Sequence, residues 1–200
     1  KEKPKEKQAT PAEQFRKFTQ DFQKDQQELN NDFRAAKTDE ERASIRERGQ
    51  KPTEFAKRAL KLAEDNADDP IAVDALLWVV RTAGQTDEAP KAMDILLKDH
   101  IDSPKLTQSL LSLGYGPVAE KIARTIREKS EDQNTKGTAT YALAQNFSTQ
   151  SQIAARQNEA EATRLSEQAD RLFEEVLSDY PDLKIGNRSA TEAIFQMLSR

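Results

Sequence analysis

Apolar residues recur along this chain every three or four positions, which is the period of an amphipathic α-helix. The strongest example is residues 70–83, where apolar side chains occur almost all round the helix and include Trp78, the only tryptophan. A helix that is apolar on all sides belongs inside a protein, so this segment is predicted to be the central buried helix. The β-branched residues there would also suit a strand, but the segment length and its capping signal favour a helix.

The same spacing predicts helices before and after this central segment. These helices cover residues 11–37, 38–48, 52–66, 87–99, 104–113, 117–129, 135–157, 159–180 and 190–198. Gly49 is predicted to end the short helix over residues 38–48, and Pro181 to end the long helix before it. No segment gives a convincing strand pattern.

Helix start signals support these boundaries. Thr10, Asp69 and Ser103 each stand before a proline, which places an N-cap residue ahead of a proline at the first helical position. Thr38 is followed three residues later by Glu41, the spacing of a capping box. The helices are therefore marked by local signals as well as by their apolar stripes.

Helices of this length joined by short turns are typical of α-solenoids. The sequence thus predicts an all-α fold, an irregular stack of antiparallel helical hairpins. Residues 169–181 are similar to the second helix and closing proline of a tetratricopeptide repeat, although the tryptophan and glycine of that motif's first helix are not evident. The C-terminal part is therefore expected to be tetratricopeptide-like rather than a regular repeat array.

The domain organisation follows from the same pattern. Residues 1–10 are charged and proline-interrupted, which predicts a disordered tail, and residues 11–200 are predicted to form a single helical domain. Within that domain the expected sections are N-terminal amphipathic helices, central hairpins and tetratricopeptide-like helices, over residues 11–49, 52–130 and 132–200.

Composition narrows the classes of function. Hydrophobic residues make up 36% of the chain and charged residues 33%, and the formal net charge is −4, so no overall basic field would attract nucleic acid. No apolar run approaches the roughly 20 residues needed to span a bilayer. The chain starts with Lys1 rather than methionine, so we expect a processed or trimmed protein, and removal of a signal peptide stays an open possibility.

Candidate catalytic and metal-binding residues are few. The chain has no cysteine, which excludes thiol chemistry and disulfides within it. His100, the only histidine, lies between Asp99 and Asp102 near a helix end, where a role beside the helix dipole is favoured over catalysis or metal binding. The acidic residues within 64–69 lack the ligand spacing of an EF-hand loop, so they are expected to end one helix and cap the next. We predict no catalytic residue, no cofactor and no metal site.

The first predicted helix carries an apolar seam that is the candidate partner-binding surface. Its members are Phe15, Phe18, Phe22, Leu29 and Phe33. Amphipathic helices often bind a partner groove or pair into dimers, which is the functional interpretation. The alternative, which ordinary burial of apolar surface favours, is that the seam packs on the chain's own helices. The oligomeric state stays open.

Several segments in consistent order resemble one bacterial family. They are residues 36–42, 69–80, 99–106, 119–129, 140–145 and 169–184. They are similar to the α-helical region that precedes the thioredoxin-like domain in exported thiol-disulfide oxidoreductases of the redoxin type. None of these segments is a catalytic motif, and without cysteine no catalytic residue of that family maps onto this chain.

The resemblance implies a location outside the cytoplasm, in the periplasm or cell envelope. It also implies a protein partner, either a redoxin domain that follows this chain or another polypeptide. The expected function is a non-catalytic helical interaction or scaffolding module. The alternatives are a fragment of a redoxin enzyme whose catalytic domain is not in this chain, and a structural helical protein of the envelope.

Overall fold

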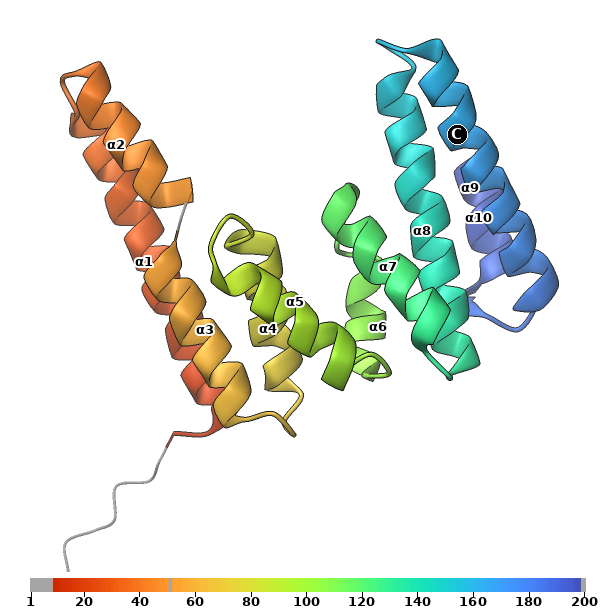
Figure 1. Ribbon diagram of the computed structural model, residues 1–200, viewed down its shortest axis with the longest axis horizontal. Helices are drawn as coiled ribbons and strands as arrows, with labels where there is room; N and C mark the ends of the chain where they lie inside the picture. The colour runs from red at the N-terminus through yellow and green to blue at the C-terminus, as the bar shows by residue number, and fades with distance from the viewer. Residues whose placement is uncertain (1–8, 51, 199–200) are drawn as a thin grey trace, which may run out of the picture. The chain divides into compact units, whose positions relative to one another are not determined.

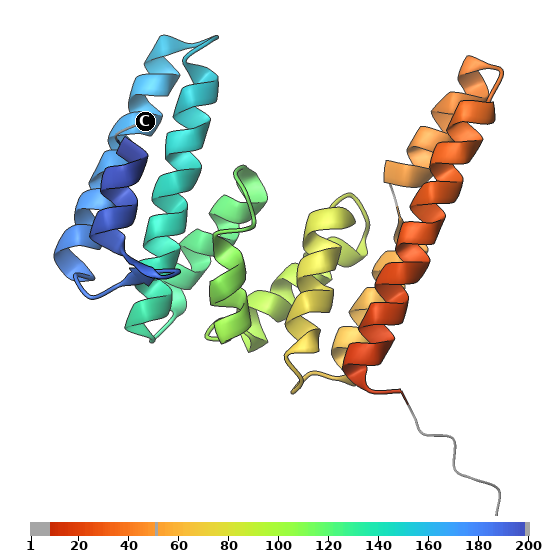
Figure 2. The same ribbon diagram turned by 180° about the vertical axis from the view of Figure 1, so that it is seen from behind.

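The computed structural model describes residues 9–50 and 52–198 and gives an all-α protein, as the sequence predicts (Figures 1 and 2). The predicted tail over residues 1–10 lies mostly outside the described residues. The helices are α1 Pro11–Ala35, α2 Asp39–Gln50, α3 Thr53–Asp65, α4 Ile71–Thr82, α5 Glu88–Asp99, α6 Pro104–Leu110, α7 Pro117–Lys129, α8 Gln133–Ala154, α9 Glu159–Asp179 and α10 Ala190–Leu198.

Contacts along the chain divide it into two compact units, Lys1–Leu96 and Leu97–Arg200. The division falls within α5, and therefore inside the section over residues 52–130 that the sequence pattern treats as one set of hairpins. Each unit has a core of its own, so the two are described separately. The apolar stripe of a helix does not show which neighbouring helix covers it. The sequence pattern therefore cannot show where one set of packed helices ends and the next begins.

Side-chain capping boxes mark the starts of α1 and α2, whereas the predicted N-cap Ser103 makes no side-chain capping bond at α6, and the N-cap position of α4 is Pro70 rather than Asp69. Thr10 Oγ1 accepts the Glu13 N–H at 3.2 Å, while Glu13 Oε2 accepts the Thr10 N–H at 2.8 Å. The predicted box at α2 has the same reciprocal bonds, at 3.1 Å to Thr38 Oγ1 and 3.2 Å to Glu41 Oε2. The prediction that Gly49 ends this helix is wrong, because α2 continues to residue 50 and Gly49 keeps a negative φ.

The first unit is built around α4. As predicted, most of its apolar residues are buried, and Val73, Leu76 and Val79 are almost inaccessible to solvent, whereas Ile71 and Trp78 are partly exposed. Helix α3 packs along α4, and its residues Ala56 and Ala59 are fully buried. Helix α1 lies against both of them, with α2 folded back beside it (Figure 1). This arrangement gives the first unit a core of aliphatic residues with aromatic rings on the α1 side.

The second unit is organised by the hairpin of α8 and α9, which lie side by side in Figures 1 and 2. Tyr141, Phe147, Leu165 and Phe173 belong to the buried cluster between them. Gly137 of α8 permits a close approach at one end, because a Cβ at this position would lie 2.9 Å from Cγ of Tyr180. Helix α7 packs on the other side of α8, and α10 closes the unit against α9.

A short β-hairpin precedes α10, and it corrects the expectation that the chain has no strand. Strand β1, Lys184–Ile185, pairs antiparallel with β2, Arg188–Ser189. The two-residue turn between them contains Gly186 at φ +65°, a conformation that side chains other than glycine rarely adopt. A strand of two residues is too short to show alternation, so its hydrophobic pattern could not reveal it.

Candidate functional site

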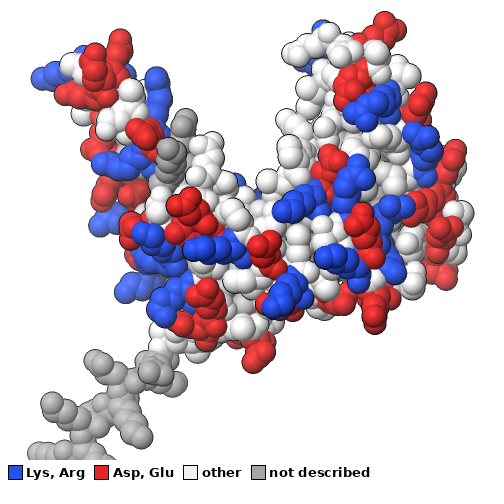
Figure 3. All heavy atoms as spheres, viewed as in Figure 1, with Lys and Arg blue, Asp and Glu red and all other residues white. Residues whose placement is uncertain are grey.

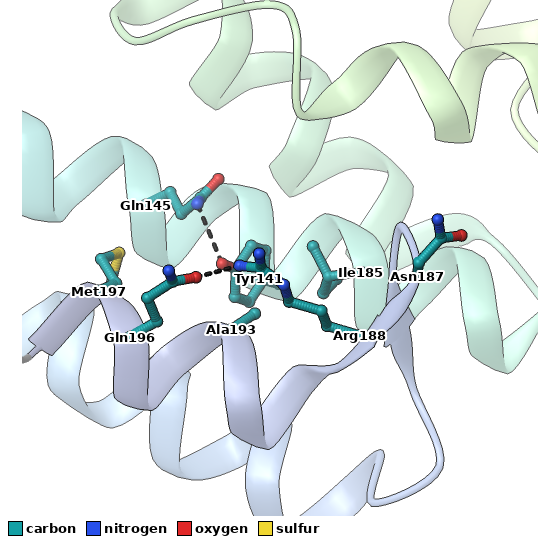
Figure 4. A pocket seen from close by; sticks show the side chains of 8 residues that line it. All are labelled: Tyr141, Gln145, Ile185, Asn187, Arg188, Ala193, Gln196 and Met197. Atoms are coloured by element: carbon teal, nitrogen blue, oxygen red, sulfur yellow. Dashed lines mark hydrogen bonds between the residues drawn. The ribbon is translucent and has the colours of Figure 1, made fainter.

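A hollow of about 310 Å³ opens on the second unit where α8, the β-hairpin and α10 meet (Figure 4). One wall is apolar and the remaining groups are mostly amides, with one phenol and one guanidinium. The lining residues are Tyr141, Gln145, Ile185, Asn187, Arg188, Ala193, Gln196 and Met197. No residue in this lining is acidic, so its formal charge at neutral pH is that of the one arginine.

Local structure places each of these groups. Tyr141 and Gln145 are one helical turn apart on α8, so they share one face of the helix. Gln145 Nε2 donates to Tyr141 Oη at 3.0 Å, which orients both side chains at the hollow. The start of α10 is held by a capping box in which Ser189 N–H donates to a Glu192 oxygen at 3.0 Å and Glu192 N–H donates to Ser189 Oγ at 3.2 Å.

Tyr141 is the most deeply buried polar group of the site. Only 3% of it is exposed, and its ring meets that of Phe173 edge-on at 5.9 Å. Burial raises the pKa of the phenol above its ordinary value of 10.0, against a smaller opposite effect of the hydrogen bond from Gln145. The phenol is therefore protonated throughout the neutral range, and its O–H is available to donate.

Arg188 reaches the hollow from the β-hairpin. One of its guanidinium nitrogens donates to Gln196 Oε1 across the opening (Figure 4). Among the described residues no carboxylate pairs with Arg188. The guanidinium thus keeps several N–H donors, and Gln196 keeps its own NH₂ group.

The predicted seam of α1 faces the interior of the first unit. Phe18 is 3% and Leu29 6% exposed, while Phe15, Phe22 and Phe33 are half-buried. Phe18 and Phe22 meet the Trp78 ring edge-on at centroid distances of 4.8 and 4.9 Å. The structure therefore gives these residues an internal packing role, and partner binding by their half-exposed edges stays a prediction.

Other sites considered from the sequence have ordinary roles in the structure. His100 is half-buried just beyond α5, and its carbonyl accepts the Ser103 N–H at 2.9 Å. Asp69 accepts the Ile71 N–H at 2.9 Å, and Lys61 pairs with Asp65 at 2.9 Å. Over residues 9–50 and 52–198, no three histidine or acidic residues lie where they could hold a metal ion together. In the same ranges no helix has the length and apolarity to cross a membrane.

A second hollow of about 300 Å³ on this unit, between α7, α8 and α9, is lined by Arg124, Arg127 and Arg171, of which the first two form ion pairs. Arg127 makes a bidentate pair with Glu175, with Nε 3.1 Å from Oε1 and Nη2 2.7 Å from Oε2, and Arg124 pairs with Glu120 at 2.8 Å. Figure 3 shows basic and acidic side chains interspersed over the face of each unit in view, without a large area of one sign. These features are typical of a solvated helical surface rather than of a binding site for a polyanion.

No sequence pattern singles out the groups around the first hollow. Tyr141 and Gln145 lie within the helix predicted over residues 135–157, and no strand pattern predicts the hairpin. One local signal was present: Gly186-Asn187 is a dipeptide that favours a two-residue hairpin turn. This turn would have placed Arg188 in a strand, but not beside Tyr141.

Comparisons with models of protein families, with curated proteins and with solved structures gave no match to this chain. The geometry of the site therefore carries the functional argument.

Proposed function

We propose that this chain is a non-catalytic helical interaction module that binds a segment of another polypeptide in the hollow between α8, the β-hairpin and α10. The observation that carries the proposal is the lining itself, which combines amide side chains with an apolar wall. Amides both donate and accept hydrogen bonds, so Gln145, Asn187 and Gln196 suit the N–H and C=O groups of a polypeptide backbone. Ile185, Ala193 and Met197 suit an apolar side chain beside it.

The dimensions favour an extended segment as the ligand. A volume of about 310 Å³ is at the lower end of the range for ligand pockets. It is too small for a whole helix, whose diameter with side chains is about 10–12 Å. A short extended stretch can place one apolar side chain against the wall while its backbone meets the amides.

The wider setting of this function rests on the resemblance to the helical region of exported redoxin-type oxidoreductases. It supports a location in the periplasm or cell envelope and an irregular solenoid-like stacking of hairpins. It also supports a role in which this module recognises a polypeptide while a redoxin domain performs the thiol chemistry. The gene sequence beyond the codon for Arg200 tests that last point directly: an open reading frame that stops there rules out a fused redoxin domain.

Selection from a displayed library of random peptides against the whole chain tests the binding function. We expect enriched peptides that perturb the side-chain amide signals of Gln145 and Gln196 in NMR titrations. Gln145→Ala should weaken their binding about tenfold, because one or two hydrogen bonds worth about 1 kcal/mol each are lost. Gln152→Ala is the matched control, since this exposed glutamine lies on the same helix outside the hollow. A library without enrichment, or peptides that bind the Gln145 variant equally well, would refute the proposal.

A further inference from the structure

We infer that the hollow recognises the C-terminal carboxylate of a polypeptide whose last residue is apolar, an inference that rests on the proposed polypeptide-binding function. The juxtaposition behind it is a guanidinium, a phenol and three amides beside a wall of Ile185, Ala193 and Met197. Three features of the lining favour this ligand: its charge, its excess of hydrogen-bond donors and the position of its apolar wall.

The charge of the lining favours an anion. Arg188 is its only ionised residue at neutral pH, and among the described residues its side-chain hydrogen-bond partner is the neutral oxygen of Gln196. A guanidinium fork without a carboxylate partner is suited to a bidentate carboxylate, because its parallel N–H groups match the spacing of the two oxygens. By contrast, Arg127 in the same unit already holds Glu175 in this way through Nε and Nη2.

The hydrogen-bonding groups also favour an acceptor ligand. Tyr141 Oη accepts a hydrogen bond from Gln145, and it donates its own proton to no other group in the described part of the chain. Gln196 uses its oxygen toward Arg188 and keeps its NH₂ group. Figure 4 shows Tyr141 Oη and the Arg188–Gln196 pair at the same opening. Donors thus outnumber acceptors, and a carboxylate offers two oxygens with about four lone-pair sites to meet them.

The apolar wall selects a chain terminus over an acidic side chain. At the C-terminal residue of a polypeptide, the carboxylate and an apolar side chain are attached to the same Cα. One residue can therefore meet Arg188 and the wall around Met197 together. An internal aspartate or glutamate carries its carboxylate at the end of its side chain. The same residue therefore has no apolar side chain that could pack against the wall. The small volume of the hollow also suits the end of a polypeptide better than an internal segment, whose chain would have to pass through the hollow in both directions.

NMR titration of the isotope-labelled chain with two matched probes tests the inference. The probes are a pool of N-acetylated hexapeptides of random sequence ending in leucine, made once as the free acid and once as the C-terminal amide. We expect the free acid to bind at least tenfold more tightly and to shift the Arg188 Nε–H signal. Arg188→Gln should abolish the difference, whereas Lys184→Gln, a loss of the same charge on the other strand of the hairpin, should preserve it. Both side chains are exposed, so neither variant is expected to unfold the unit.

The outcomes separate this inference from the function on which it rests. If the amide binds as tightly as the free acid, the carboxylate inference fails while polypeptide binding stands. If neither probe binds, both fail. Hexanoate is the third probe: binding as tight as that of the free-acid peptides would show a site for small carboxylic acids and would overturn the choice of a polypeptide terminus.

Discussion

Replacing Gly137 by alanine should destabilise the second unit, although the same change usually stabilises a helix. Alanine is favoured over glycine inside a helix by about 1 kcal/mol. At this position, however, the new Cβ would lie 2.9 Å from Cγ and 3.0 Å from Cδ1 of Tyr180, and 3.2 Å from Cδ2 of Leu183. Cγ is bonded to Cβ of Tyr180, so the ring can move away from the new Cβ only by a change of χ1 that disturbs its packing or by a shift of the chain before Pro181.

The expected magnitude is the difference between two effects. Overpacking of a dense interior costs about 1–3 kcal/mol, and the gain in helix propensity offsets about 1 kcal/mol of it. Gly137→Ala should therefore lower the free energy of unfolding by up to about 2 kcal/mol. In a chain that already carries Tyr180→Ala, the clash with the ring is absent, so the added Gly137→Ala should raise the free energy of unfolding. The coupling between the two substitutions should be about 1–3 kcal/mol.

Urea unfolding followed by far-ultraviolet circular dichroism measures this double-mutant cycle. Trp78 lies in the first unit and is the only tryptophan, so its fluorescence monitors that unit separately and should be unaffected. Gly49→Ala is the matched control, because its Cβ would meet only Leu29 Cδ1, at an ordinary 3.7 Å. It should leave stability unchanged or raise it by up to about 1 kcal/mol. A stabilising Gly137→Ala in the otherwise unaltered chain would refute the reasoning.

Three further predictions concern the core, a cap and an ion pair. Trp78→Ala should destabilise the first unit by about 3–5 kcal/mol in denaturant titrations, and an unchanged midpoint would contradict its place in the aromatic cluster. The N–H groups of Lys37 and Thr38 lower the pKa of Glu41 from 4.5, so its stabilising effect is present above that pH and lost as the pH falls through the folded-state pKa. Glu41→Gln should therefore lose less stability than the unaltered chain on acidification, and identical pH profiles would count against the cap. A double-mutant cycle of Arg127→Ala and Glu175→Ala should give about 1 kcal/mol of coupling that declines with added salt, while zero coupling would show a purely surface pair.

The elements that the sequence predicted well depend on interactions between close neighbours. The capping box at Thr38 links residues three positions apart, and the apolar character of residues 70–83 follows from their own side chains. Such features form wherever the segment is placed, so pattern and capping chemistry are sufficient to find them. The hairpin before α10 has strands of two residues, which are too short to show an alternating pattern. The turn signal at Gly186-Asn187 is its only signal in the local sequence.

The hollow was beyond prediction because its groups come from three separate elements. Tyr141 and Gln145 belong to α8, Arg188 to the hairpin, and Gln196 and Met197 to α10. No spacing in the sequence relates these positions, since they meet only after α10 has folded back onto the unit. The seam of α1 shows the converse: its pattern was visible at once, but the pattern alone could not distinguish packing on Trp78 from binding a partner.

The amino-acid sequence by itself determined that this chain is helical, where most of its helices begin and which of them is buried. Helix formation depends on hydrogen bonds and side-chain contacts within a few residues, so that information is local. Only the tertiary structure decided how the chain divides at α5, which ring faces Gly137 and which donors surround one opening. Those outcomes depend on contacts between distant segments, whose complementarity in shape and charge exists only once the helices have packed.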